Sequence, residues 1–172
     1  WTATQLGSLT ASMAAGLTAA QLAGLSTAQT RNLSASVISA LSADQFAALS
    51  AAQLAVLTAT QIKGLTATDV SELTGTGMAA LAATQLAALT AGAIAGLSEE
   101  QIAALTTTQF KGLTASQVGS LSNAQLSALT DGHIGVLTTA AVLGLKPAQL
   151  AELTPAQLAG FSPKQLSALT IT

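Results

Sequence analysis

Apolar and polar positions recur along this chain in a strict eight-residue cycle. With the one exception of Phe161, Leu begins each cycle from Leu9 to Leu169, and Trp1 begins the first cycle. A second side chain, apolar in nearly every cycle, follows five positions later. The cycle gives twenty-one octads over residues 1–168, with the consensus L-[ST]-x-x-Q-[apolar]-x-[small], and a remnant over residues 169–172. Residues 1–172 are therefore predicted to form one continuous repeat array.

The polar positions of the octad predict where helices start. Position 2 is Ser or Thr in nearly every octad, and all fourteen Gln residues stand at position 5. Ser or Thr followed three residues later by Gln is a capping box, in which each side chain binds the other residue's backbone amide. Pro147, Pro155 and Pro163 all occupy position 3, the first helical position, where a missing amide hydrogen costs nothing. Each octad is thus predicted to begin a new short helix.

Two sets of residues follow from this interpretation. The residues predicted to cap helices are Gln21, Gln45, Gln53, Gln61, Gln101, Gln109, Gln149 and Gln157, with Thr18, Ser42, Ser50 and Thr58. The predicted core is made of Leu17, Leu41, Leu49, Leu57, Leu65, Leu97, Leu105 and Leu113. Isolated helices shorter than about 12 residues are marginal in water, so stability must come from stacking.

Two other folds compete with short stacked helices. In one long helix the apolar stripe would rotate by roughly 80° per octad, and each interior Pro would cost about 3 kcal/mol. A β-solenoid would need apolar positions that alternate with period two, and it would need residues that favour strands more than Ala and Gln do. Both alternatives fit the octad less well than an all-α solenoid with one capped helix per repeat.

The number of octads per coil is the open part of this prediction. Position 8 of even-numbered octads holds only Gly, Asn or Ala, whereas odd ones also admit Val56 and Glu72. This alternation favours a 16-residue coil of two antiparallel helices, with Gly providing a left-handed cap or a close backbone approach. Coils of three or four octads remain as alternatives.

Composition excludes several classes of function. Only 7% of residues are charged and the formal net charge is -2, so there is no basic surface for nucleic acid. Ser, Thr or Gln interrupts every apolar stretch before the ~18 residues that a membrane span needs. Cys is absent, which removes disulfides and thiolate chemistry. No basic stretch followed by an apolar one opens the sequence, so an export signal would have to lie outside this segment.

Residues with possible chemistry are few, and each has a structural interpretation. His133, the only His, replaces a position-5 Gln near Asp131, but no second His or Cys completes a metal site. Glu99 and Glu100 fall in a first helical turn, where negative charge favours the helix dipole. Arg31, Lys63 and Lys111 are sparse enough to be a solvated edge. We therefore expect no enzyme activity, no catalytic residues, no metal and no cofactor.

Tracts such as "LTATQIKGLTATDVSELT" and "LSEEQIAALTTTQFKGLT" resemble octapeptide arrays found within very large secreted or surface-attached bacterial proteins. The resemblance covers the whole chain and implies an extracellular stalk or adhesin-like segment. It transfers no functional residues. The fragment "LTPAQL" also resembles the opening of the repeats of transcription-activator-like effectors, but the period here is too short for a base-reading repeat.

The expected function is structural. The chain is predicted to serve as an extended spacer or a self-assembling filament element, contacting neighbouring repeats of a longer chain or further copies end to end. Its terminal coils should expose apolar core, because solenoids need polar caps. The alternative is a ligand-binding face of Ser and Thr rows, suited to carbohydrate or to a crystalline surface such as ice. The identity of any small-molecule ligand is left open.

Overall fold

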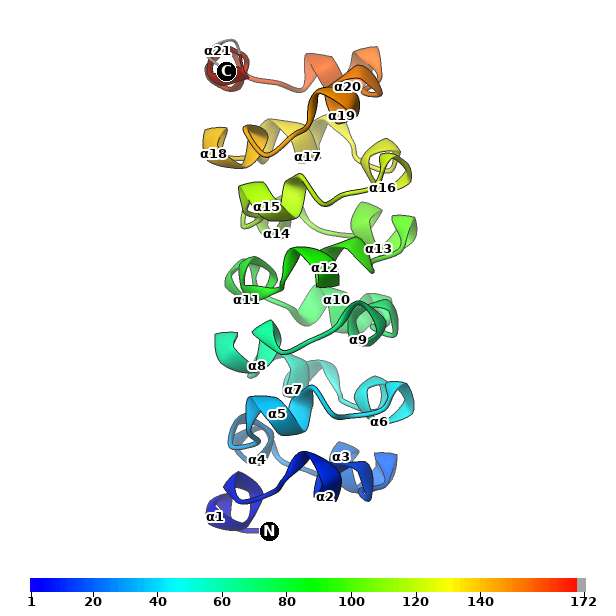
Figure 1. The fold of residues 1–172 in the computed structure, drawn as a ribbon, viewed down its shortest axis with the longest axis vertical. Helices are drawn as coiled ribbons and strands as arrows, with labels where there is room; N and C mark the ends of the chain where they lie inside the picture. Colours follow the sequence, from blue (N-terminus) through cyan, green and yellow to red (C-terminus); the bar gives the residue numbers. More distant parts are fainter. Residues whose placement is uncertain (170–172) are drawn as a thin grey trace.

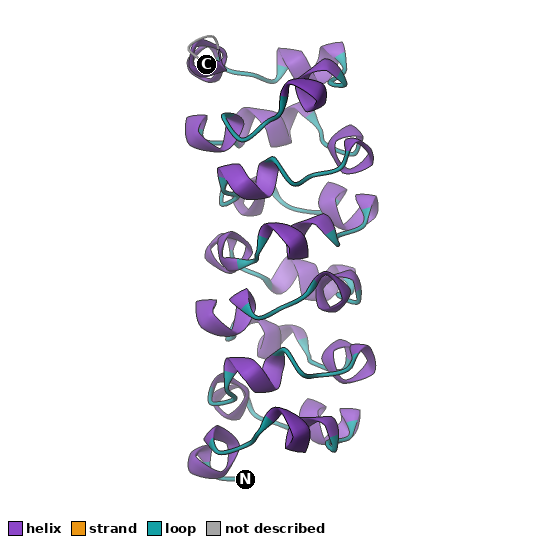
Figure 2. Cartoon of the chain, viewed as in Figure 1, coloured by secondary structure: helices purple, strands orange, loops and turns teal. Residues whose placement is uncertain are grey.

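A computed structural model describes residues 1–169, in which short α-helices follow one another at intervals of one octad (Figures 1 and 2). The helices are α1 (Ala3–Gly7), α2 (Ala11–Ala15), α3 (Ala19–Ala23), α4 (Thr27–Arg31), α5 (Ala35–Ile38), α6 (Ala43–Ala47), α7 (Ala51–Ala55), α8 (Ala59–Lys63), α9 (Ala67–Ser71), α10 (Gly75–Ala80), α11 (Ala83–Ala88), α12 (Ala91–Ala95), α13 (Glu99–Ala103), α14 (Thr107–Phe110), α15 (Ala115–Val118), α16 (Asn123–Ser127), α17 (Asp131–Val136), α18 (Thr139–Val142), α19 (Pro147–Ala151), α20 (Pro155–Ala159) and α21 (Pro163–Leu169). No strand occurs among residues 1–169, so the predicted all-α repeat solenoid is confirmed. The last three residues of the predicted remnant lie outside the described residues.

Local sequence decides where each helix begins. In α8, for example, Thr58 is the N-cap in extended conformation, and its hydroxyl accepts a hydrogen bond from the Gln61 amide at 3.3 Å. Pro147, Pro155 and Pro163 are the first residues of their helices, as their position in the octad predicts. A Pro there has the backbone φ that the helix needs and lacks only an amide that would have no partner.

The coil is longer than the two octads predicted. Helices along the column pack against the third helix along the chain, as in the pairs α7 with α10, α8 with α11 and α9 with α12. Hydrogen bonds between coils join residues 28 apart, such as Gln45 with Leu17. This step equals three and a half octads. Each octad therefore contacts two octads of the preceding coil, the one three repeats earlier and the one four repeats earlier, where these two meet. The prediction of two octads per coil is therefore wrong.

The odd and even octads that suggested a two-octad coil do not form separate environments. Each octad contacts the octad three repeats earlier, of opposite parity, and the octad four repeats earlier, of the same parity, so both classes meet neighbours of both kinds. Gly at position 8 does not provide left-handed caps either. None of the described glycines has a positive φ, and the caps at Gly64, Gly96 and Gly160 are right-handed helical.

Close approach between coils explains several of these glycines instead. A Cβ atom placed on Gly144 would lie only 2.0 Å from the carbonyl oxygen of Ala115, at the start of α15 in the neighbouring coil. Gly96 and Gly112 meet Ala67 and Ala83 of their own neighbouring coils in the same way, at 2.5 to 2.6 Å. A hydrogen atom in place of a methyl group lets these backbones touch.

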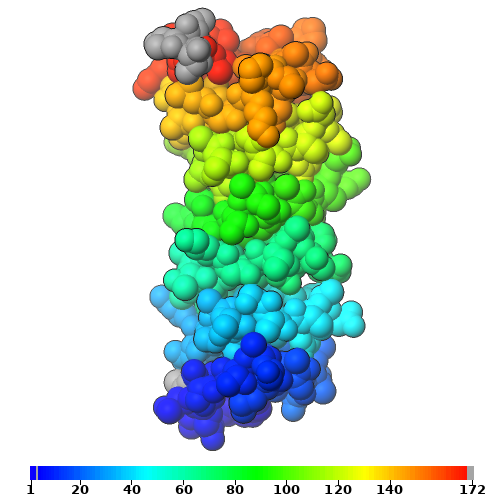
Figure 3. Space-filling model, viewed as in Figure 1, coloured from blue at the N-terminus to red at the C-terminus, as the bar shows by residue number. Residues whose placement is uncertain are grey.

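Leucine at position 1 and the apolar residue at position 6 fill one continuous core. Of the predicted core residues, the buried ones are Leu41, Leu49, Leu57, Leu65, Leu97, Leu105 and Leu113. Leu17 in the first coil is half-buried and packs against the same core. The coils stack into a column with the two ends of the chain at opposite ends (Figures 1 and 3).

The two ends of the column show which way each side chain faces. In the first coil the position-6 residues Leu6 and Leu22 are fully buried, whereas Gln5 and Gln21 are exposed. In the last coil Gln165 is buried, whereas the position-6 residue Leu166 is 44% exposed. Position 5 therefore faces the preceding coil and position 6 is covered by the following coil.

Candidate functional site: the glutamine ladder

Gln117 shows how one side chain serves two coils. Its Oε1 accepts a hydrogen bond from the backbone amide of Thr114 at 2.8 Å, which completes the capping box of α15. Its Nε2 donates to the carbonyl oxygens of Leu86 at 2.7 Å and Leu89 at 2.8 Å in the preceding coil. The residue is only 1% exposed, so these bonds lie away from water. Both ends of the amide are therefore used.

The same arrangement recurs along the column, and we call it the glutamine ladder. Its members all donate from Nε2 to carbonyl oxygens about 28 to 31 residues earlier: Gln29, Gln45, Gln53, Gln61, Gln85, Gln101, Gln109, Gln117, Gln125, Gln149, Gln157 and Gln165. Gln29 reaches the carbonyl of Trp1, which is 28 residues away. Gln5 and Gln21 stand in the first coil that the structure describes, and both side chains are exposed.

The residues predicted to cap helices are placed as follows. Complete capping boxes join Thr18 with Gln21, Ser42 with Gln45, Ser50 with Gln53 and Thr58 with Gln61. Gln101, Gln109 and Gln157 form complete boxes with Ser98, Thr106 and Thr154. At Gln149 only the glutamine half exists, because Lys146 has no hydroxyl to accept from the helix. Seven of these eight glutamines, all except Gln21, also belong to the glutamine ladder.

Sequence reasoning missed the second role of the glutamine. A capping box accepts Glu as readily as Gln at N3, the third residue of the helix, because only a side-chain oxygen is needed. Here every long polar side chain at position 5 is Gln except His133, and none is Glu. That exclusive choice is the signal for an Nε2 donor, since a carboxylate oxygen would repel the carbonyl oxygens that it faces.

His133 reproduces the contacts of a ladder glutamine. Its Nδ1 accepts from the Thr130 amide at 3.3 Å, and its Nε2 lies 2.8 Å from the carbonyl oxygen of Leu105, 28 residues earlier. With Nδ1 as acceptor, Nε2 carries the proton and donates to Leu105. The ring also stacks on Phe110 with centroids 4.9 Å apart. A structural role therefore accounts for both ring nitrogens.

We expect His133→Gln to change the free energy of unfolding by less than about 1 kcal/mol, because the new amide can make both hydrogen bonds and loses only the ring stacking. His133→Leu should cost clearly more, since it leaves the Leu105 carbonyl and the Thr130 amide without this partner. Urea unfolding monitored by circular dichroism measures both. Equal losses for Gln and Leu would show that the two hydrogen bonds of His133 contribute nothing.

Asp69 caps its helix but cannot bridge the coils. Its Oδ2 accepts from the amide of Thr66 at 2.7 Å and from the Thr66 hydroxyl at 2.8 Å, and the side chain is buried. By the spacing of the glutamine ladder, the carbonyls below it are those of Ile38 and Leu41. An ionised carboxylate has no proton to donate to either of them.

Asp69→Gln is therefore expected to raise the free energy of unfolding by about 1 kcal/mol, because the amide gains donors toward Ile38 and Leu41 while its oxygen keeps the capping bond. Met13→Gln is the matched control, since position 5 of the first coil has no earlier coil to bind and gains a cap alone. Differential scanning calorimetry compares the two. A larger gain at Met13 than at Asp69 would contradict bridging.

The remaining charged residues do not assemble into a reactive site. Glu99 and Glu100 occupy the first turn of α13, and the pKa of Glu100 is lowered by a hydrogen bond from its own backbone amide and one from the Ser98 hydroxyl. Asp131 accepts from the amide of Gly132 at 2.8 Å, in the first turn of α17. Within residues 1–169, no group of three His, Cys, Asp or Glu side chains is placed to hold a metal ion.

Short capped helices, a 28-residue coil and a core that runs through every coil define a helical repeat protein of the solenoid class. A family model described as the ALTTAQ repeat matches residues 78–115. Within that stretch, residues 104–109 spell ALTTTQ, which spans position 8 of one octad to position 5 of the next. Comparison with curated proteins and with solved structures gives no match. The described helices are all short, and none of them could span a membrane.

Proposed function

We propose that this chain is a structural spacer, an extended and axially stiff segment of a bacterial surface or secreted protein. The observation that carries the proposal is the glutamine ladder, which joins each coil to the next from Gln29 to Gln165. Because the bonds run along the column axis, they resist both separation and sliding of neighbouring coils. No catalytic step and no cofactor belong to this proposal.

The end coils supply the contacts by which such a spacer would continue. The first coil presents the amides of Gln5 and Gln21 toward any earlier coil, and the last coil exposes Leu158 and Leu166 at 45% and 44%. These are the groups that join the inner coils to one another. They suit neighbouring repeats of a longer chain, or a second copy stacked end to end as a filament element.

The extracellular location rests on resemblance. Octads such as "LTATQIKG" are similar to those of large secreted or surface-attached bacterial proteins, in which a stalk holds other domains away from the cell. A surface made chiefly of Ala, Ser and Thr, with 7% charged residues in the chain, fits a spacer that makes few specific contacts of its own. The adhesin-like setting is part of the proposal.

A tandem of two copies joined in octad register tests the spacer directly. Residue 168 of the first copy would be followed by residue 1 of the second, and small-angle X-ray scattering would be measured in about 0.5 M salt to screen lateral charge contacts. A spacer predicts that the longest dimension doubles while the cross-sectional radius of gyration stays the same. A tandem that bends freely at the junction, or folds back on itself, would contradict it.

A second candidate is the predicted ligand-binding face, favoured by one surface groove. A hollow of about 640 Å³ lies between α8, α11 and α15, lined on its polar side by Thr60, Lys63, Thr90, Thr114 and Ser116. Hydroxyls and one cation around a shallow groove suit a carbohydrate. Chemical-shift perturbation by oligosaccharides, confined to the residues of this groove and lost in Thr90→Val, would support this candidate over a plain spacer.

A further inference from the structure

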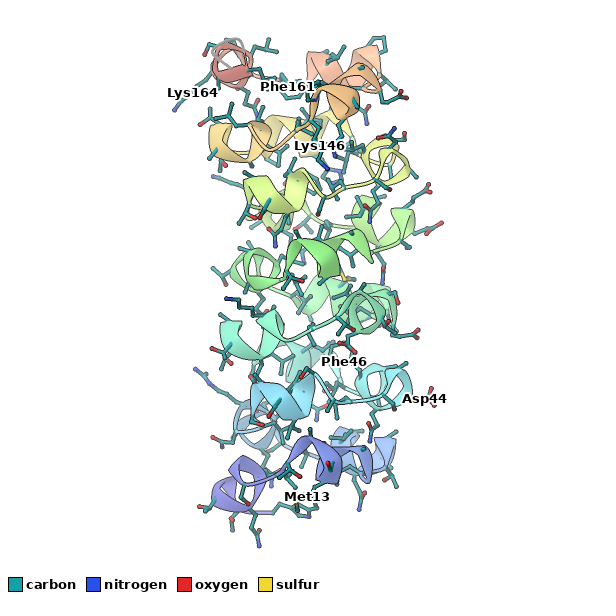
Figure 4. All side chains as sticks on the ribbon, viewed as in Figure 1. Met13, Asp44, Phe46, Lys146, Phe161 and Lys164 are labelled. Carbon is teal, nitrogen blue, oxygen red and sulfur yellow. The ribbon has the colours of Figure 1, made fainter. Side chains whose placement is uncertain are left out.

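Eight of the twelve charged side chains lie on two opposite sides of the column, and the other four are Asp69, Asp131, Lys146 and Glu152. In Figure 1, α4, α8, α14 and α21 lie on the left side, and α6, α9 and α13 lie on the right side. The left side carries what we call the basic edge: Arg31, Lys63, Lys111 and Lys164. The right side carries what we call the acidic edge: Asp44, Glu72, Glu99 and Glu100. Figure 4 labels one member of each, Lys164 on the left and Asp44 on the right.

Neither edge mixes the two signs, whereas the octad of α19, which belongs to neither edge, holds both Lys146 and Glu152. The octads that contain α4, α8, α14 and α21 hold no Asp or Glu, and those that contain α6, α9 and α13 hold no Lys or Arg. Helices on the basic side stack directly, as α8 does on α11 and α11 on α14, so like charges share one surface. Stacking like charges on one surface does nothing to stabilise the column itself, because they repel one another.

All eight side chains remain available to a partner. Each of them is exposed, and none forms an ion pair with another residue in the part of the chain that the structure describes. Charges that stabilised the column would instead alternate in sign from coil to coil and pair across it. The observed arrangement therefore points outward.

The spacing matches the coil for three residues of the acidic edge and for the first two residues of the basic edge. Asp44, Glu72 and Glu100 follow one another at intervals of one full coil, the same step that separates Gln45 from Leu17. Arg31 and Lys63 are four octads apart, again close to one coil. Two columns placed side by side would thus bring at least two consecutive coils of the basic edge against two consecutive coils of the acidic edge. Over those coils the surfaces are complementary in sign and in step.

We propose that copies of this chain associate side by side, with the basic edge of one copy against the acidic edge of the next. The two edges lie on opposite sides of the column, so the contact is heterologous and leaves one edge of each kind free. Such a contact does not close, and repetition extends it into a sheet of aligned columns. Exposed ion pairs are individually weak and are screened by salt, so the association requires several pairs and low ionic strength.

Sedimentation velocity of the full chain over a concentration series tests the proposal. In about 20 mM salt the average mass should rise with concentration, and in about 0.5 M salt the chain should be monomeric. A constant monomeric mass at low salt would overturn the proposal. End-to-end stacking of the apolar terminal coils would persist in about 0.5 M salt, so it is distinguished from the lateral contact.

Two variants with an unchanged formal net charge of -2 separate the pattern of charge from its amount. The scrambled variant carries Arg31→Glu, Lys111→Glu, Glu72→Lys and Glu100→Lys, which mixes the signs on each edge. The exchanged variant reverses all eight edge residues, which swaps the two edges and keeps them complementary. We expect the scrambled variant to lose the low-salt association by about tenfold or more and the exchanged variant to retain it.

The fold is checked in the same samples, because all eight positions are exposed and the variants should keep the helical circular dichroism of the parent. Equal association of the scrambled and parent chains would show that the edges are not the interface. Loss of association in the exchanged variant, with its helical content intact, would also overturn the proposal.

Discussion

Replacement of Gln117 by Ala is expected to lower the free energy of unfolding by about 3 kcal/mol. The change removes the bond to the Thr114 amide, worth about 1 kcal/mol as a helix cap, and two bonds to the carbonyls of Leu86 and Leu89, worth about 1 kcal/mol each. The loss is large because the site is buried and water cannot replace the missing donor. Urea unfolding followed by circular dichroism at 222 nm measures it.

Matched variants separate capping from bridging at this site. Thr114→Ala removes the hydroxyl that accepts from the Gln117 amide at 3.4 Å and donates to its Oε1 at 3.1 Å, but it leaves both bonds to the preceding coil, so it should cost about 1 kcal/mol. Gln21→Ala, in the first coil, should also lose a cap alone. Gln117→Glu keeps the capping oxygen but turns the other end of the side chain into an acceptor that faces Leu86 and Leu89. Its stability should fall at least as far as that of Gln117→Ala at neutral pH.

The Gln117→Glu variant also has a predicted pH dependence. Burial and the two facing carbonyls would raise the pKa of the new carboxyl above its unfolded value of about 4.3. A raised folded pKa means that the folded state binds the proton more tightly, so stability relative to the parent should recover as pH falls through the folded pKa. Equal losses for Gln117→Ala and Thr114→Ala, with no pH dependence in the Gln117→Glu variant, would contradict the bridging role.

Replacement of Gly144 by Ala is the second change with a large expected effect, a loss of about 3 kcal/mol. The new methyl group would lie 2.0 Å from the carbonyl oxygen and 2.6 Å from the carbonyl carbon of Ala115. Both contacts are to backbone, which cannot rotate away, so α15 and the loop after α18 must separate. Thermal unfolding monitored by circular dichroism should show a clearly lower midpoint.

Gly75→Ala provides the control for Gly144→Ala. Gly75 begins α10, and a Cβ atom placed there meets nothing within 4 Å. This substitution should stabilise the chain by up to about 1 kcal/mol, because it restricts the unfolded backbone and favours the helix. If Gly144→Ala were as well tolerated as Gly75→Ala, the coils could not be in the close contact described.

The helices could be predicted from sequence because their start signals are local. A hydroxyl at position 2, Gln at position 5 and Pro147, Pro155 and Pro163 at position 3 all act within a single octad. None of these signals requires knowledge of which octad lies next to which. Because these signals are local, the sequence predicts the capping bond that each Gln side-chain oxygen accepts. It does not predict the bond that the amide nitrogen of the same side chain donates to the preceding coil.

The number of octads per coil could not be derived in this way, because it depends on how helices from distant octads pack. The alternation of Gly at position 8 suggested two octads, but contacts with octads both three and four repeats earlier remove that distinction. Two other features of the sequence carry information about contacts between coils. Asp44, Glu72 and Glu100 recur at the length of one coil, and the absence of Glu from position 5 indicates a buried donor.

A pair of engineered cysteines tests the 28-residue coil most directly, since the chain contains no Cys of its own. A Cβ atom on Gly64 would lie 3.5 Å from the Cβ of Ser39 in the neighbouring coil, which suits a disulfide. Ala48 and Gly64, two octads apart, are the pair that a two-octad coil would bring together. Mild oxidation of each double-cysteine variant, read by non-reducing electrophoresis and intact mass, should give a rapid intramolecular disulfide for 39 with 64 and little for 48 with 64. Preferential crosslinking of 48 with 64 would contradict the three-and-a-half-octad coil and the glutamine ladder built on it.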